Sequence, residues 1–497
     1  MLFNSPAFLF AFLPVVLIVF GFVRHRGRWA LICLVAASFV FYAQWSVPYL
    51  GLLIVLMIAN YWIGKALGVN QSRLILSLGV ALNLAVLGYF KYTNFLIEII
   101  SEATGITAGH FNILLPLGIS FFIFQKIAYL VDIYQKRIAQ HDFVDYCLFV
   151  SFFPQLIAGP IVHAREVMPQ FSGVGRSPLV QNIAIGGTIF VIGLAKKMLL
   201  ADTFALIANP VFNTALDRPP HLVVAWAGAV AYGLQIYFDF SGYSDMAIGL
   251  ARMFGITLPV NFASPYKSRS IIEFWRRWHI TLTRSLTDYI YSPIALSLAR
   301  RGVQAGAGRV AFFALSVLIP VNITFLVSGI WHGAGWTFVL WGALHGIGLA
   351  LNQAWCEFGW RKPMPPLLAR LLTFTFVTLL WVPFRSASLD AAGTIWSGMI
   401  GLNGIYNSGD LGSYGKLAWP LLPVGLMIAF FAPNTQTLMR EFHPILEHER
   451  SDTDIDRDGF SSFLWHPLPR FAFVVGIFLA VCSLKLNDVS AFIYFQF

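Results

Sequence analysis

The chain of 497 residues is 58% hydrophobic and only 11% charged, and its formal net charge at pH 7 is +10. Soluble domains carry about 25% charged residues, so this composition excludes an ordinary soluble protein and indicates an integral membrane protein. Nucleic-acid binding is not indicated either, because the Lys and Arg residues alternate with apolar runs and form no separate basic domain. Membrane topology and anionic lipid headgroups explain the basic balance, and a basic loop patch that receives an anionic cofactor remains possible in addition.

Uncharged runs long enough to cross a bilayer follow one another along the chain. The first, residues 6–23, has no basic leader before it and is expected to remain as a membrane anchor. Residues 29–64 have room for two spans, broken near residues 44–48. Further runs cover residues 310–331, 333–356 and 417–439. Length predicts roughly ten to twelve membrane segments, and an all-α integral membrane fold is expected because a helix satisfies its own backbone polar groups in lipid.

The basic residues between the runs predict the orientation of the chain. Lys and Arg are enriched in cytoplasmic loops, so the loop after the first run is expected in the cytoplasm and the N-terminus on the outer side. The residues assigned to the cytoplasm in this way are Arg24, Arg26, Arg28, Lys65, Arg73, Lys136, Arg137 and the basic residues between 267 and 309.

One membrane domain is predicted over residues 1–497, with a polar loop between spans at residues 440–470. Within this loop DIDRDG matches the first half of a calcium loop, but Trp465 stands where a bidentate Glu is required. A solvated acidic loop is therefore expected. The four cysteines form no CxxC pair, so neither a metal site nor a disulfide framework is predicted.

Three histidines lie in or beside the apolar runs: His279, His332 and His345. Ionisable groups at membrane depth are costly and usually face an interior cavity, so each is a functional candidate. His279 lies in residues 270–294, which also carry several arginines and are predicted to form an amphipathic or re-entrant helix at the cytoplasmic boundary. At helical spacing, Trp275 shares one side with Leu282.

Asp239 and Asp245 flank the sequence SGY directly after an apolar run. Carboxylates at the end of a span can orient a histidine or pair with an arginine. A structural ion pair with the nearby basic segment is the favoured interpretation.

The residues leave three functions open. A histidine with a pKa near 6.5 is suited to general-base catalysis at neutral pH. The chain has no GxSxG elbow, no HExxH pair and no Walker loop. A base-catalysed group transfer without a protein nucleophile, a proton-carrying transporter and a purely structural role all remain possible on these grounds.

Four segments resemble the membrane-bound O-acyltransferases, and specifically their bacterial AlgI-like branch of alginate O-acetyltransferases. These are FFPQLIAGPI (152–161), YFDFSGYSDMAIGL (237–250), EFWRRWHITL (273–282) and WHGAGWTFVLWGALHG (331–346), to which LLPLGISFFIFQKIAYLVDIY (114–134) and the terminal FIYFQF add. The resemblance covers nearly the whole chain. It implies a ring of helices around a tunnel, in which an acyl group passes from a cytoplasmic thioester to a hydroxyl.

The resemblance also implies roles for particular residues. His332 falls on the family's catalytic histidine, and His279 falls on its second active-site polar residue. His279 is expected to donate a hydrogen bond to the developing oxyanion. His345 is expected to be a channel or packing residue, unless the glycine-rich break after His332 folds it back. Supporting or channel positions are expected at Trp331, Asp239 and Tyr237, and donor binding at Arg276 and Arg277.

Partners and substrates are implied in the same way. The donor is expected to be acetyl-CoA or an acyl carrier thioester, with no permanently bound cofactor. A periplasmic SGNH-like acetyltransferase partner and the polysaccharide export machinery are expected, in the bacterial inner membrane, among membrane lipid and with no nucleic acid. The acceptor is expected to be an alginate-like exported polysaccharide. Peptidoglycan, cellulose or teichoic-acid acyl transfer, or a non-enzymatic transporter, are the alternatives.

Overall fold

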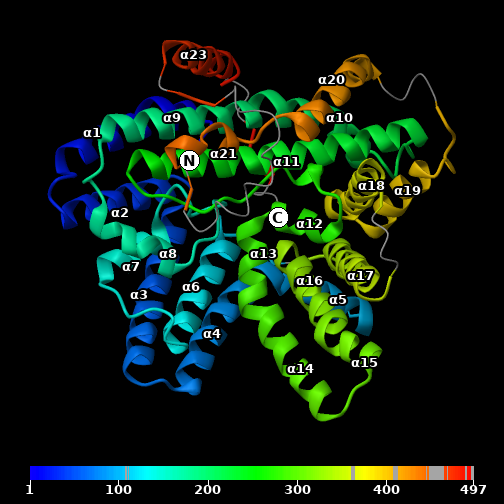
Figure 1. The fold of residues 1–497 in the computed structure, drawn as a ribbon, viewed down its shortest axis with the longest axis horizontal. Coiled ribbons are helices and arrows are strands. Elements are labelled where there is room, and N and C mark those ends of the chain that lie inside the picture. The colour runs from blue at the N-terminus through cyan, green and yellow to red at the C-terminus, as the bar shows by residue number, and fades with distance from the viewer. Residues whose placement is uncertain are drawn as a thin grey trace. The chain divides into compact units, whose positions relative to one another are not determined.

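The computed structural model describes residues 1–106, 109, 111–359, 364–406, 412–443, 445–446, 464–466, 468–486 and 490–493. Every regular element in these ranges is a helix (Figure 1). The predicted all-α fold class is therefore confirmed. The chain divides into two compact units, which are described separately. The first contains Met1–Ala195, Gly242–Val260 and Thr435–Gln496, and the second contains Lys196–Ser241 and Asn261–Asn434.

The first unit is built from helices of both chain ends. Its helices are η1 (Ala7–Phe12), α1 (Leu13–Val23), α2 (Arg28–Ala43), α3 (Val47–Val69), α4 (Arg73–Leu87), η2 (Gly88–Tyr92), α5 (Thr93–Thr104), α6 (Ile119–Tyr134), α7 (Phe143–Ser151), α8 (Ala164–Val167), η3 (Met168–Gly173), α9 (Leu179–Ala195), α21 (Thr435–Leu438), η8 (Arg440–Phe442) and α23 (Pro469–Leu484). Helix α11 (Leu222–Met253) supplies its last part to this unit.

The second unit contains the first part of α11 and the helices that follow it. These are η4 (Lys196–Ala201), α10 (Asp202–Asn213), η5 (Pro265–Lys267), α12 (Ile271–Arg277), α13 (Ile280–Leu286), η6 (Thr287–Tyr291), α14 (Ser292–Gln304), α15 (Arg309–Phe313), η7 (Ala314–Leu318), α16 (Ile319–His332), α17 (Trp336–Phe358), α18 (Pro366–Arg385), α19 (Leu389–Met399) and α20 (Gly412–Phe431).

Six helical stretches of the described chain are long and apolar enough to cross a membrane. They are Val47–Val69, Arg73–Thr104, Leu179–Asn213, Leu222–Met253, Arg309–His332 and Pro366–Arg385. Four shorter apolar helices accompany them at Ala7–Val23, Arg28–Ala43, Pro420–Phe431 and Pro469–Leu484. The predicted break near residues 44–48 is confirmed, because α2 ends at Ala43 and α3 begins at Val47.

The uncharged run at 417–439 does not form one span. Helix α20 ends at Phe431, and Asn434 is buried with its amide donating to Ser264 Oγ at 3.3 Å. Pro433 explains the end, because proline lacks an N–H group and disfavours a helical conformation of the residue before it. The predicted loop at 440–470 lies largely outside the described residues, and its calcium-like DIDRDG sequence lies wholly outside them.

Helices α16 and α17 form a tight antiparallel hairpin in the second unit (Figure 1). Only Gly333–Gly335 separate them. At their contact the Cβ position of Gly342 would lie 3.3 Å from the Cα of Gly329 and would collide with the carbonyl oxygen of Phe325. Small residues let helix backbones approach this closely in membrane proteins. The hairpin therefore depends on these two glycines.

We expect Gly342→Ala to force α16 and α17 apart, because the clash is with backbone and no side chain can move aside. The expected result is a lower thermal unfolding midpoint in detergent and a loss of catalytic activity. Gly393→Ala is the matched control, since the Cβ position of this α19 glycine has no atom within 4 Å. Equal stability of the two variants would contradict the close-packed hairpin.

Candidate active site

The segment predicted to form one amphipathic helix is broken at His279. Helix α12 ends at Arg277, α13 begins at Ile280, and His279 between them has a left-handed backbone with φ of 43°. Backbone N–H and C=O groups at the break bond to the extended residues before α12 instead of to their own helix. Ile280 N donates to the carbonyl of Asn261 at 3.0 Å, and Ala263 N donates to the carbonyl of Arg277 at 3.0 Å. The spacing argument failed because it assumed that one continuous helix joins Trp275 to Leu282.

The side chain of Asn261 sets the proton position on His279. The backbone N–H of Thr281 can only donate, and it points to Asn261 Oδ1 at 3.3 Å. The Thr281 hydroxyl donates to the same oxygen at 2.9 Å. His279 Nδ1 lies 3.0 Å from this acceptor, so Nδ1 carries the proton. In the neutral ring Nε2 then holds the lone pair.

The neutral form of His279 is favoured by its surroundings. The side chain is fully buried, and the residue lies outside the six long apolar stretches. Burial lowers the pKa of the His279 ring to about 3. A neutral ring with its lone pair on Nε2 accepts a hydrogen bond at that atom. Donation from Nε2 to an oxyanion, the role predicted from the resemblance, would require protonation that burial opposes.

His332 is the last residue of α16 and lies close to His279. Their ring centroids are 6.5 Å apart. The ring of His332 is buried among three aromatic rings, with centroid distances of 5.0 Å to Trp331, 5.2 Å to Trp341 and 5.3 Å to Phe384. A helix C-terminus carries partial negative charge, which stabilises an imidazolium.

The hairpin brings His345 back beside the same aromatic cluster. Trp341 contacts both histidines, with centroid distances of 5.2 Å to His332 and 4.8 Å to His345. Trp275 Nε1 donates to His345 Nδ1 at 3.3 Å, so the proton of the neutral His345 ring is on Nε2. The alternative in which the glycine break folds the chain back is the one that the structure shows. These contacts give His345 a packing environment.

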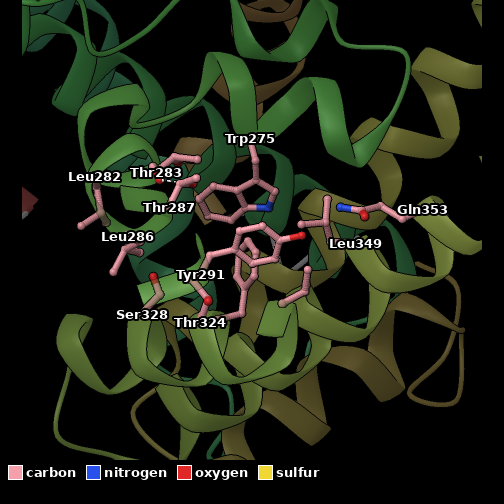
Figure 2. Close-up of a pocket in the computed structure, with 12 residues that line it drawn as sticks. Trp275, Leu282, Thr283, Leu286, Thr287, Tyr291, Thr324, Ser328, Leu349 and Gln353 are labelled. Carbon is pink, nitrogen blue, oxygen red and sulfur yellow. Dashed lines mark hydrogen bonds between the residues drawn. The ribbon is translucent and has the colours of Figure 1, made fainter. Parts of the chain in front are cut away.

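Trp275 also lines a cavity of about 170 Å³. Figure 2 shows its indole between the side chains of α13, such as Leu286, and those of α17, such as Leu349. The hydroxyls of Thr287 and Thr324 donate to carbonyls of their own helices at 2.7 Å. The walls are therefore mainly apolar, although several threonines line them.

The ion pair predicted for Asp239 is found, with Lys197 as its partner rather than a residue of the basic segment. Lys197 Nζ lies 2.6 Å from Asp239 and 2.8 Å from Asp202. Lys197 and Asp239 each have a side chain only 2% exposed. Sequence reasoning missed Lys197, although a lysine inside an apolar run signals an oppositely charged neighbour at membrane depth.

The remaining predicted residues have the following environments. Tyr237 packs against Tyr266 at 5.4 Å, and its ring lies 6.3 Å from that of Trp278. In the first unit, Asp245 accepts from the Thr435 hydroxyl at 2.6 Å.

The two arginines predicted to bind the donor differ in exposure. Arg277 is buried, pairs with Glu273 at 2.9 Å and donates to the carbonyl of Ala263 at 3.3 Å. Arg276 is exposed. Their donor-binding role stays a prediction, and Arg277 also has a structural role that any substitution would disturb.

The sequence was compared with known proteins. The model of MBOAT, the membrane-bound O-acyltransferase family, matches residues 52–383. The chain belongs to this family. The matched range includes His279, His332 and His345, so the predicted resemblance is confirmed and the protein is an O-acyltransferase.

Several named relatives of this acyltransferase are similar over most of their length. It is 43% identical over 446 residues to the peptidoglycan O-acetyltransferase of Helicobacter pylori, covering 82% of this chain and 81% of that one. It is 36% identical over 526 residues to the probable alginate O-acetylase AlgI of Azotobacter vinelandii, covering all of both chains. The Pseudomonas aeruginosa protein of the same name is 41% identical over 409 residues, covering 80% of this chain and 75% of that one. These relatives support polysaccharide O-acetylation as the general activity.

We expect Asp239→Asn to destabilise the acyltransferase, because it leaves Lys197 buried with half of its negative partners. Breaking a buried ion pair typically costs about 3–5 kcal/mol, and the remaining Asp202 should hold the loss near the lower end. Thermal unfolding in detergent measures the change. The double variant Lys197→Met, Asp239→Leu should regain most of the loss. A fully stable Asp239→Asn variant would contradict the buried pair.

We expect Asn261→Asp to alter the pH dependence of catalysis. A carboxylate 3 Å from the ring raises the pKa of His279, by about one to three units. Protonation of His279 removes the acceptor at Nε2 at a higher pH than in the wild type, so the acid limb of log kcat against pH should steepen. Asn209→Asp, which adds the same charge beside Arg385, is the control. An unchanged slope would show that catalysis does not need the His279 lone pair.

Proposed function

We propose that this acyltransferase moves acetyl groups from a cytoplasmic thioester, acetyl-CoA or an acyl carrier thioester, toward an exported polysaccharide. The paired imidazoles of His279 and His332, 6.5 Å apart in a buried aromatic cluster, carry the proposal. The proton position of His279 and the buried surroundings of both rings suit a base-catalysed attack of a hydroxyl on a thioester. The proposed location is the bacterial inner membrane.

In the proposed reaction His332 takes the proton of the acceptor hydroxyl while its oxygen attacks the thioester carbonyl. The tetrahedral intermediate then expels the thiolate, which receives the proton from the His332 imidazolium. The position of His332 at the end of α16 stabilises that imidazolium between the two steps. Before the attack His279 accepts a hydrogen bond at Nε2 from the incoming hydroxyl and orients it, and the hydroxyl then turns its one proton to His332.

The surrounding aromatic side chains serve the same chemistry by excluding water. Thioesters hydrolyse when water reaches an activated carbonyl, and a closed apolar site prevents this side reaction. Trp331, Trp341 and Phe384 enclose the His332 ring on several sides. Loss of one of these rings is therefore expected to raise hydrolysis relative to transfer.

The proposed acceptor is an exported glycan of the alginate type, reached through a periplasmic SGNH-like partner. The relative named as an alginate O-acetylase matches the whole length of this chain. A second candidate acceptor is peptidoglycan, because the relative named as a peptidoglycan O-acetyltransferase has the higher identity of 43%. Alginate and peptidoglycan differ in which hydroxyls they present, so direct assay separates the two.

We expect His332→Ala to lower acetyl transfer by about 10²–10⁴-fold, the usual contribution of a general base. The measurement is transfer of labelled acetyl from acetyl-CoA by the full chain in nanodiscs with its periplasmic partner, with alginate and peptidoglycan supplied in parallel. His345→Asn is the matched control. It should stay within about tenfold of the wild type, because Asn retains an acceptor for Trp275 and His345 makes no bond to the reacting atoms.

Near-normal transfer by His332→Ala at matched protein level would overturn the catalytic assignment. Transfer to peptidoglycan alone would replace alginate as the acceptor. Failure of the wild type to use either acetyl-CoA or an acetylated carrier protein would overturn the proposed donor.

A further inference from the structure

A cleft of about 640 Å³ with charged and apolar walls lies in the first unit, and none of the candidate active-site residues lines it. Three chain segments form it: the loop between α1 and α2, the start of α7, and the residues from η3 to Arg176. Its volume is within the range of ligand sites, about 300–1,000 Å³. The charged and titratable side chains that line it are Arg24, His25, Arg28, His141, Asp142, Asp145 and Arg176.

The backbone holds this cleft in a fixed shape. Gly27 and Gly175 have positive φ angles of 52° and 84°. A Cβ atom at Gly175 would collide with the carbonyl oxygen of Arg24. The loop at Arg24 and the loop at Gly175 therefore touch through backbone atoms. This contact places Arg24 and Arg176 at the same cleft and does not depend on their side chains.

The cleft favours an anion. Its three guanidinium groups are permanently charged, and the ion pair of Arg28 with Asp142 at 2.7 Å is exposed, with side-chain exposures of 62% and 48%. Exposed pairs of this kind contribute little and exchange readily. Burial raises the pKa of Asp145, and the charge of Asp142 beside it acts in the same direction. An incoming anion can therefore take over guanidinium contacts at small cost.

The N-terminus of α2 adds to the positive electrostatic potential of the cleft. Helix α2 begins at Arg28, its preceding residue Gly27 provides no side-chain cap, and both residues line the cleft. The N-terminus of a helix carries partial positive charge and binds phosphate groups. Together with the arginines from a second segment, it forms a site of the kind that phosphate esters occupy.

The cleft lies on the side of the membrane that the sequence assigns to the cytoplasm. The positive-inside rule placed the loop at Arg24–Arg28 and the loop after Lys136 in the cytoplasm, and the structure brings both loops to the same cleft. Trp29, beside it, is 64% exposed, as expected for an aromatic residue at a membrane–water interface.

We propose that this cleft binds a phosphate group at the cytoplasmic face of the acyltransferase. Two sources have this chemistry: the headgroup of an anionic phospholipid, and the phosphates of the nucleotide in coenzyme A. The second source rests on the proposed function, whereas the first does not. In either case Arg24, Arg176 and the N-terminus of α2 hold the phosphate.

The test measures binding to the full chain in phosphatidylcholine nanodiscs, without any acetyl-transfer readout. Short-chain phosphatidylglycerol and free coenzyme A are titrated separately. The double variant Arg24→Gln, Arg176→Gln should weaken binding about tenfold or more, because hydrogen bonds to charged groups are lost. Lys65→Gln, Arg73→Gln removes the same charge from another predicted cytoplasmic loop and is the matched control. Raising ionic strength should weaken wild-type binding to the exposed site.

Each outcome decides the proposal. A selective loss of phosphatidylglycerol binding in the cleft variant supports a lipid site, and a selective loss of coenzyme A binding supports a donor site. Equal binding of both probes by the wild type, the cleft variant and the control overturns the proposal. Because the Arg24 contact with Gly175 is made by its backbone, the variants should fold; Arg176→Gln alone provides the same test if the double variant does not. Binding can fail while acetyl transfer persists, so this result is separate from the proposed function.

Discussion

The close backbone contact between α16 and α17 is the constraint on which the candidate active site depends. Gly329 and Gly342 allow the two helices to meet with no side chain between them. His332 then lies at the end of one helix, and Trp341 of the other helix packs against it. The same contact brings His332 and His345, thirteen residues apart in the sequence, to one aromatic cluster around Trp341. A membrane protein gains little from the hydrophobic effect between helices, so packing of this kind has to supply the specificity.

Asn261 has a comparable role for the second histidine. Its backbone carbonyl and side-chain oxygen hold the first residues of α13, and its Oδ1 fixes the proton of His279 on Nδ1. A left-handed backbone at a non-glycine residue is unfavourable, and such strain is often found where a side chain must be aimed. The hydrogen bonds to Asn261 compensate for it. The conformation and tautomer of the ring thus follow from one neighbouring residue, and burial favours its neutral form.

Two buried cations of the second unit have fixed internal partners, whereas the arginines of the cleft in the first unit face water. Lys197 lies between two carboxylates, and Arg277 is bound by Glu273 and a backbone carbonyl. The arginines of the cleft are exposed or partly exposed, and their one ion pair there is weakly held. This contrast separates structural charge from charge available to a ligand. The contrast arises from the difference in solvent access, because a buried charged group needs a fixed partner and an exposed charged group does not.

The sequence by itself determined the all-α membrane class, the break between α2 and α3, and the family, because bilayer thickness sets run length and four motifs occur in order. It also singled out His279, His332 and His345, since ionisable residues stand out against apolar surroundings. It did not determine the break at His279, the end of α20 or the pairing of Lys197 with Asp239. Those depend on partners distant in sequence, such as Asn261, which periodicity cannot reveal. Only the tertiary structure decided which ring atoms of His279 and His345 hold protons, because the hydrogen bonds that fix them join separate segments.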